Sequence, residues 1–364
     1  MTPLSIAIVG AGLSGLRTAS LLATAGVDSI ILEGRSRTGG RAYSVGIANS
    51  KLDIPRPRYD LGGTWFWPDG QTRIRDLVTE LGLSTFPQFS KGAMQVERYR
   101  LERVQSYPGP LTSTLTMRFT GGTQSLIERL QMSLPSSSIK LNATVRRIVR
   151  NAGTTISITL GNDQVVHAKR VVLALPPRLI ARNISFDPPL SDSLTKSLLN
   201  MPTWVGSQAK TLSIYDAPFW RDSNLSGMAS SFIGPMQEIH DASPLDGTGA
   251  LMGFSSLSPA GRLALGEERL RELAVAQLER LFGKAAGKPL AVIHKDWAQD
   301  PYTATADDFE PPNEYPAYGI PSGGEDLWDG QLIFAGSETS NEHPGYLEGA
   351  LSAAARAADS ILTA

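Results

Sequence analysis

The chain has 364 residues, of which 41% are hydrophobic and 19% are charged, and its formal net charge is −1. These values are typical of a globular protein with room for two domains, and they exclude the basic surface expected of a nucleic-acid-binding protein. Cysteine is absent, which excludes disulfides, thiolate nucleophiles, cysteine-ligated metals and a thioether bond to a cofactor.

The first predicted element is a buried parallel strand at residues 5–9, followed by Gly10, Gly12 and Gly15 and by a predicted helix over residues 13–24. In this order the first glycine allows a tight turn, the second lets backbone approach a phosphate, and the third lets the helix pack on the strand. The dipole of the helix N-terminus favours an anion. The pattern predicts a dinucleotide pyrophosphate site in a Rossmann-like fold.

A second predicted strand, residues 29–32, ends in Glu33. An acid about 20 residues beyond the glycines is expected to bind the hydroxyl groups of a ribose. The segment that follows carries another glycine pair and three arginines near the expected pyrophosphate, namely Arg35, Arg37 and Arg41. Two glycine loops with arginines suit a long, extended cofactor.

Residues 59–68 have the sequence YDLGGTWFWP. Gly62 and Gly63 would let the backbone approach a flat ring closely, and the aromatic side chains that follow would wall a cavity. An aromatic loop that only fills a junction between domains is the alternative, and the residues leave it open.

The middle of the chain predicts three short strands at residues 145–150, 155–160 and 164–168, followed by a buried strand at residues 170–175. This order indicates a three-stranded meander that returns to a parallel sheet. Further on, residues 259–282 are rich in Leu, Glu and Arg and predict one amphipathic helix.

With these motifs, the chain resembles the flavin-containing amine oxidase family, which includes monoamine and polyamine oxidases and L-amino acid oxidases. The most specific matches are residues 332–339, LIFAGSET, and residues 343–350, HPGYLEGA. The resemblance implies oxidation of an amine to an imine by hydride transfer to N5 of an FAD, with O2 as the expected oxidant giving H2O2. Because the chain has no cysteine, the FAD is expected to be bound noncovalently.

The resemblance also implies the architecture, an α/β fold whose Rossmann-like FAD-binding domain is discontinuous. We expect that domain at residues 1–78, 121–186 and 325–364. An α+β substrate-binding domain on a mixed sheet is expected at residues 79–120 and 187–324.

The site residues are likewise carried over from the family. The segment that ends in Pro218-Phe219-Trp220 makes Lys210 the expected catalytic group, bonded through a water to flavin N5. The expected cofactor-binding residues are Gly10, Gly12, Leu13, Ser14, Gly15, Glu33, Gly34, Arg35, Gly40, Arg41, Gly62, Gly63, Thr64, Val145, Gly336, Ser337, Glu338, Tyr346 and Leu347.

The expected substrate-binding residues are Tyr346, Trp297, Trp65 and Asp307. The last of these marks a departure from the family, because Asp307 or a neighbour stands near the place of a second aromatic residue. An acid there either pairs with a second cationic group of the substrate or turns into solvent, and the sequence does not decide between them.

Two other functions remain open at this stage. One is a desaturase or protoporphyrinogen-oxidase-like enzyme with an apolar substrate, and the other is a flavin-binding protein without turnover. A nicotinamide dehydrogenase would leave the two C-terminal motifs without a role.

The expected partners are a small amine and O2, with no nucleic acid, no membrane and no metal, and a homodimer is left open. The scattered histidines, for example, lack metal-ligand spacing. The chain enters its first strand too early for a signal peptide, and it has no apolar run of about 18 residues, so we expect a cytoplasmic protein.

Overall fold

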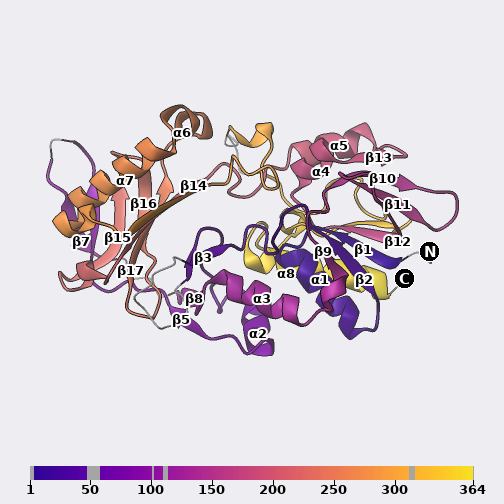
Figure 1. Ribbon diagram of the computed structural model, residues 1–364, viewed down its shortest axis with the longest axis horizontal. Coiled ribbons are helices and arrows are strands. Elements are labelled where there is room, and N and C mark those ends of the chain that lie inside the picture. Colours follow the sequence, from indigo (N-terminus) through magenta and orange to yellow (C-terminus); the bar gives the residue numbers. More distant parts are fainter. Residues whose placement is uncertain (1–3, 47–57, 101, 110–113, 311–315, 364) are drawn as a thin grey trace.

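A computed structural model describes residues 4–46, 58–100, 102–109, 114–310 and 316–363. The molecule is elongated, with one large sheet in each half and both chain termini at the same end (Figure 1). This α/β architecture, with a Rossmann-like half and a second half on a mixed sheet, agrees with the predicted fold class.

The sheet in the half that holds the termini has eight strands in the order β13-β10-β11-β12-β1-β2-β9, with β19 beside β12. These strands are β1 (Leu4–Val9), β2 (Ser29–Leu32), β9 (Ile139–Lys140), β10 (Val145–Arg150), β11 (Ile156–Leu160), β12 (Val165–Leu173), β13 (Ser185–Asp187) and β19 (Leu332–Phe334). The neighbours of β1 on both sides, β2 and β12, run parallel to it.

The apolar run in β1 supplies both faces of this sheet, because successive side chains of a strand point in opposite directions. Ile6 and Ile8 are packed in a core with side chains of α1 (Leu13–Thr24), α3 (Thr123–Met132) and α8 (Leu347–Leu362). Ala7 and Val9 are packed in a second core with the meander, α4 (Pro177–Asn183) and α5 (Asp192–Leu199). The first strand is therefore buried on both sides.

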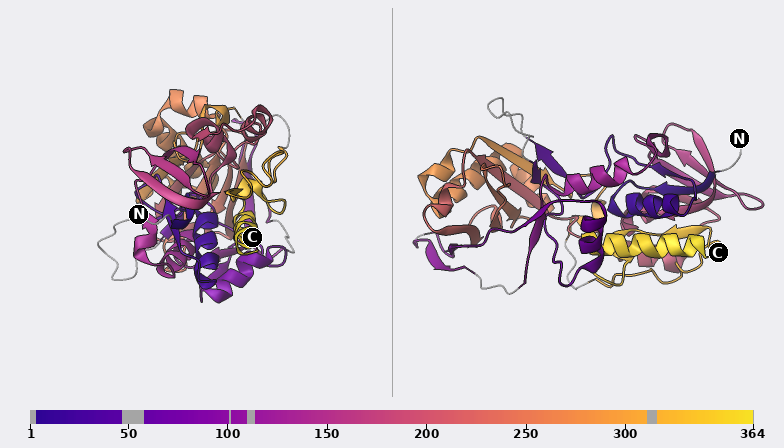
Figure 2. Two further views of the ribbon diagram at one scale, coloured as in Figure 1. Left: turned by 90° about the vertical axis from the view of Figure 1, so that its right-hand side faces the viewer. Right: turned by 90° about the horizontal axis from the view of Figure 1, so that it is seen from below.

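The two ends of the chain meet on the first of these faces. Helices α1 and α8 lie side by side in all three ribbon views, with α2 (Thr72–Glu80) next to α8 (Figure 2). The N-terminal glycine motif and the C-terminal motif are therefore neighbours in space, as expected from the resemblance described above.

The sheet in the other half has seven strands in the order β18-β14-β17-β16-β15-β6-β7. They are β6 (Ala93–Glu97), β7 (Gln105–Pro108), β14 (Ala209–Tyr215), β15 (Leu225–Ser231), β16 (Met236–Asp241), β17 (Gly249–Ser255) and β18 (Ala291–Asp296). Two short pairs, β3 (Ser44–Gly46) with β4 (Arg58–Asp60) and β5 (Thr85–Pro87) with β8 (Met117–Phe119), are the remaining strands of the described residues. The division of the chain into two domains at the expected boundaries is retained as a proposal, supported by this distribution of strands.

Two predicted elements are wrong in detail. The strands expected at residues 164–168 and 170–175 are one strand, β12, whose first part pairs antiparallel with β11 and whose last part pairs parallel with β19. The helix expected at residues 259–282 is two helices, α6 (Pro259–Leu265) and α7 (Glu267–Phe282). They are separated by Gly266, whose φ of 81° no α-helix accommodates.

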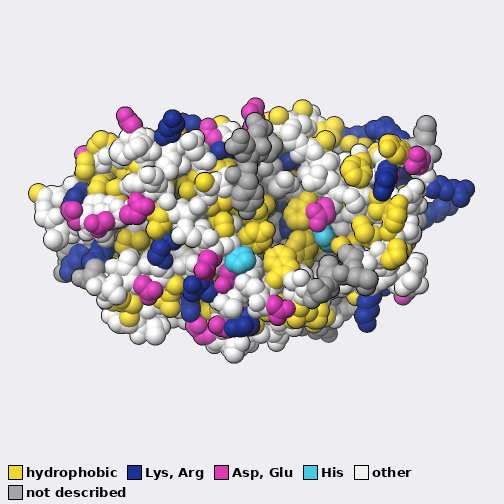
Figure 3. Space-filling view, turned by 180° about the vertical axis from the view of Figure 1, so that it is seen from behind, with side chains coloured by type: hydrophobic (Ala, Val, Ile, Leu, Met, Phe, Trp, Pro, Cys, Tyr) yellow, Lys and Arg dark blue, Asp and Glu magenta, His cyan; other side chains and the backbone are white. Residues whose placement is uncertain are grey.

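The charged side chains on the face shown in Figure 3 are of both signs and interspersed, while hydrophobic side chains gather around the middle of that face. Among the described residues, no helix has the length and apolar character needed to cross a membrane.

Candidate active site

The first glycine loop follows β1 and leads into α1. Gly10 has a φ of 103° and Gly15 lies against the Gly10 carbonyl, so a Cβ on either residue would collide with backbone. Gly12 differs, because a Cβ there would meet nothing within 4 Å. Gly10 and Gly15 are thus explained by the fold of the chain itself, whereas Gly12 borders open space at the helix N-terminus.

Glu33 lies at the end of β2 beside this loop and is 4% exposed. Its Oε2 accepts a hydrogen bond from the Ala11 amide at 2.7 Å, and its Oε1 accepts one from the Arg35 amide at 2.9 Å. Each carboxylate oxygen can accept a second hydrogen bond. The side chain is therefore fixed in place and still able to accept from ribose hydroxyl groups.

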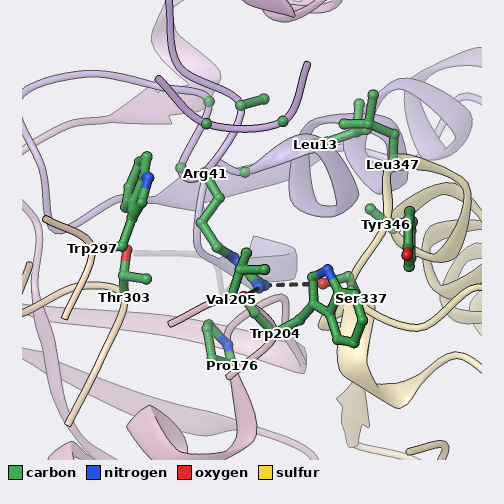
Figure 4. Close-up of a pocket in the computed structure, with 18 of the residues that line it drawn as sticks. Leu13, Arg41, Pro176, Trp204, Val205, Trp297, Thr303, Ser337, Tyr346 and Leu347 are labelled. Atoms are coloured by element: carbon green, nitrogen blue, oxygen red, sulfur yellow. Dashed lines mark hydrogen bonds between the residues drawn. The ribbon is translucent and has the colours of Figure 1, made fainter. Parts of the chain in front are cut away.

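Arg41 is held by the C-terminal motif. Its guanidinium donates to both carboxylate oxygens of Glu338, at 2.6 and 2.9 Å. It also donates to the Ser337 hydroxyl at 3.0 Å (Figure 4). Glu338 is fully buried and also accepts from the Trp204 amide at 3.0 Å. Burial alone would raise the pKa of Glu338, but Arg41 and these hydrogen bonds outweigh it and hold the pKa below its usual value.

The second glycine loop, Gly62 to Thr64, meets Lys210. A Cβ on Gly62 would overlap the Arg41 carbonyl, so this position requires glycine. The Lys210 Nζ donates to the Gly62 carbonyl at 2.5 Å and to the Thr64 hydroxyl at 2.8 Å. The ammonium group also lies 5.0 Å from the ring centre of Phe254. The lysine thus ties the loop to the second sheet.

Lys210 is 5% exposed, on β14. Burial lowers the pKa of its ammonium group to about 8; Arg118 acts in the same direction and Asp60 opposes it. A buried lysine whose pKa is close to neutrality is an uncommon group, and such groups are concentrated at functional sites.

Aromatic side chains line the cavity near α8. The ring centre of Tyr346 lies 5.1 Å from that of Trp204 and 6.0 Å from that of Trp67. Trp204 is packed on Gly345 and is followed by Val205, whose φ of 49° is rare for a β-branched residue. Strained backbone of this kind is concentrated at functional sites. The Trp204 ring comes from the loop before β14, and the sequence analysis did not identify it.

A cavity of about 590 Å³ joins these groups. The predicted residues that line it are Gly10, Gly12, Leu13, Ser14, Glu33, Arg35, Gly40, Arg41, Gly62, Gly63, Thr64, Trp65, Lys210, Trp297, Gly336, Ser337, Tyr346 and Leu347. Trp67, one of the aromatic residues expected to wall a cavity, also lines it, and further lining residues that the sequence analysis missed include Trp204, Val205, Gln208, Glu238 and Phe254. The structure therefore brings most of the predicted site together in one place.

Five predicted residues lie outside the lining of this cavity. Gly34 and Val145 border a second cavity that shares Gly10 and Glu33 with the first. Gly15 packs against the Gly10 carbonyl, and Glu338 contacts the lining of the cavity through hydrogen bonds from Arg41, Ser337 and the Trp204 amide.

Asp307 is the fifth of these residues, and the expectation that it faces the substrate is not met in the main cavity. Its carboxylate pairs with Arg182 through two hydrogen bonds, at 2.7 and 2.9 Å, on the border of the second cavity. The Arg182 bonds lower the pKa of Asp307. Of the two alternatives, the structure favours the one in which this acid turns away.

The residues present fit an FAD. Open space lies in front of Gly12, as the approach of a pyrophosphate requires, and Glu33 retains acceptor capacity beside it. Leu347, the first residue of α8, lines the cavity close to Gly63, so a helix N-terminus faces the space where a flavin ring would lie. The cavity then continues past Lys210 to the second sheet.

Comparisons with known proteins agree with this geometry. Residues 99–362 match the model of the family described as flavin containing amine oxidoreductase, and residues 8–81 match that of an NAD(P)-binding Rossmann-like domain. The chain is 27% identical to amine oxidase [flavin-containing] B of Sus scrofa over 466 aligned positions, which cover 99% of this chain and 86% of that protein.

Solved structures show the same fold. Putrescine oxidase bound to putrescine matches with a TM-score of 0.82 and 24% identity, covering 100% of this chain and 99% of that one. Cyclohexylamine oxidase from Brevibacterium oxydans matches with a TM-score of 0.81 and 20% identity, covering 99% of both chains.

Proposed function

This chain belongs to the flavin-containing amine oxidoreductase family, and from that premise we propose that it oxidises an amine at the Lys210 end of the main cavity. It is an FAD-dependent enzyme, as its family and its relatives indicate. The absence of cysteine supports noncovalent binding of the FAD. The reaction converts a C–N single bond to an imine, which water hydrolyses to a carbonyl compound and ammonia or a shorter amine.

The observation that carries this proposal is the position of Lys210. Its ammonium group is buried, it donates to the glycine loop at Gly62 and Thr64, and it borders the same cavity as the N-terminal glycines. Both hydrogen bonds of this cation go to uncharged groups, and among the described residues Lys210 forms no ion pair that would explain its place.

The chain's residues would act mainly by positioning. When bound, FAD supplies the acceptor for the two electrons that leave the amine. Tyr346 and Trp204 offer ring faces that hold a neutral amine and exclude water. The N-terminal end of α8, at Leu347, favours negative charge in the space that it faces. Lys210 would hold a water molecule through its remaining N–H group.

Three finer points stay predictions. O2 as the electron acceptor follows from the resemblance to the oxidases of this family. The cytoplasmic location is an expectation from the sequence alone, and a homodimer is a possibility that the sequence leaves open.

Anaerobic mixing of the purified holoenzyme with separate panels of amines and of apolar, amine-free compounds tests the proposal. Loss of the absorbance of oxidised flavin with an amine is the expected result. Bleaching only by the amine-free compounds would favour the desaturase-like alternative. Bleaching by neither panel would favour a flavin-binding protein without turnover.

A further inference from the structure

Three residues that line the outer part of the main cavity lie in one row across the second sheet. Lys210 on β14 is directly opposite Phe254 on β17, and Phe254 is directly opposite Glu238 on β16. Both strand pairs are antiparallel, and residues opposite one another in such pairs project from the same face of a sheet. Lys210, Phe254 and Glu238 therefore point to the same side, and all three border the cavity.

The spacing in this row is set by the sheet itself. Neighbouring strands lie about 4.8 Å apart, so the backbones of Lys210 and Glu238 are separated by about 10 Å. Between them lies Phe254, and Trp65 packs next to it with ring centres 6.2 Å apart. Along this row the cavity is therefore lined first by the ammonium group of Lys210, then by the rings of Phe254 and Trp65, and then by the carboxylate of Glu238.

Glu238 differs from the other acid of the lining. Glu33 is buried and fixed by two backbone amides, whereas the Glu238 side chain is 59% exposed. Glu238 Oε1 lies 2.7 Å from His240 Nε2, and this hydrogen bond lowers the pKa of the Glu238 carboxyl. The His240 ring in turn packs edge-on against Trp65, with centres 4.8 Å apart. Glu238 is thus an ionised group held at a fixed place.

Building on the function proposed above, we propose that Glu238 binds a second cationic group of the substrate, so that the preferred substrates are diamines with an aliphatic linker. The linker would lie on Phe254 and Trp65, which are apolar faces. Like charges repel at short range, so Lys210 disfavours an ammonium group beside it and orients the charged end toward Glu238. The role that the sequence analysis considered for Asp307, which lies in a short 3-10 turn, falls to Glu238 on β16.

The experiment compares a diamine with its matched monoamine, diaminohexane with hexylamine, on the holoenzymes of the wild type and Glu238→Gln. We expect the ratio of kcat/KM for diaminohexane to that for hexylamine to fall about tenfold in Glu238→Gln, mainly through KM for the diamine, since a charged hydrogen-bonding partner is lost. Glu268→Gln removes an exposed acid on α7 that does not line the cavity, and its ratio should equal that of the wild type.

Two further measurements keep the outcome interpretable. Glu238→Lys should lower the ratio beyond the value for Glu238→Gln, because it replaces attraction with repulsion. Raising the ionic strength should lower the ratio of the wild type and leave that of Glu238→Gln nearly constant, since salt screens an exposed pair of charges.

A ratio in Glu238→Gln equal to that of the wild type would overturn the role of Glu238. The function proposed above would survive that result if either amine still reduced the flavin of the wild type. If neither amine reduced it, both proposals would fail together.

Discussion

The two ends of the main cavity differ in the groups that form their walls. At the end near the termini, backbone forms the walls, with Gly10 and Gly62 at close approaches of two segments and Gly12 facing open space. At the other end, side chains that project from one sheet form the walls, with Lys210 and Glu238 at the two ends of a row.

This difference shows which part of a site can vary independently of the fold. The glycine end leaves little freedom, because a Cβ on Gly10 or Gly62 would collide with backbone of another segment. The side-chain end can change its chemistry by single substitutions on strands that remain in place. We therefore expect the cofactor to be common to the family and the substrate to be decided by residues such as Glu238.

The largest effect is expected from breaking the ion pair that fixes the glycine end. Glu338→Gln should lower the free energy of unfolding by about 3 kcal/mol, because Arg41 would lose a buried ionic partner. Denaturant unfolding measures the change. The matched control is Glu80→Gln, which breaks an exposed pair with Arg17 and should cost less than about 1 kcal/mol. Equal losses in the two variants would contradict the structural role of Glu338.

A smaller and more selective effect is expected at Gly12. A Cβ there meets no protein atom within 4 Å, so Gly12→Ala should leave the thermal stability of the apoprotein unchanged. If FAD occupies the open space, its affinity should fall by at least about tenfold, or about 1.4 kcal/mol. Release of fluorescent FAD on dilution gives the affinity. Gly70→Ala, also without neighbours within 4 Å but outside the cavity, is the control. Unchanged FAD affinity in Gly12→Ala would place the cofactor elsewhere.

The smallest effect is expected at Asp307. Its carboxylate is paired with Arg182 and does not line the main cavity. Asp307→Asn should therefore leave KM for monoamines and diamines at the wild-type values, which steady-state kinetics with both amines would check. A rise in KM for the diamine alone would indicate that Asp307 binds the second cationic group of the substrate.

The sequence predicted those features that depend on neighbours along the chain. Gly10, Gly12 and Gly15 are recognisable because a strand, a tight turn and a helix must follow one another within a few residues. The break at Gly266 was missed, since the apolar pattern continues across it and only its positive φ interrupts the helix.

The features that the sequence did not predict depend on contacts between distant segments. The row that joins Lys210 to Glu238 follows from the register of three strands, which no local pattern encodes. Trp204 reaches Tyr346 through a strained turn at Val205, and a valine gives no local signal of a positive φ. The orientation of the Asp307 side chain depends on its ion pair with Arg182, which lies on α4.

The central claim is that Lys210 acts where the amine and the flavin ring meet, and rapid mixing of Lys210→Met holoenzyme tests it most directly. The variant should retain its FAD, while flavin reduction by an amine or reoxidation by O2 slows by at least about tenfold, the scale expected for loss of a positioned donor. Wild-type rates in both half-reactions would contradict the account.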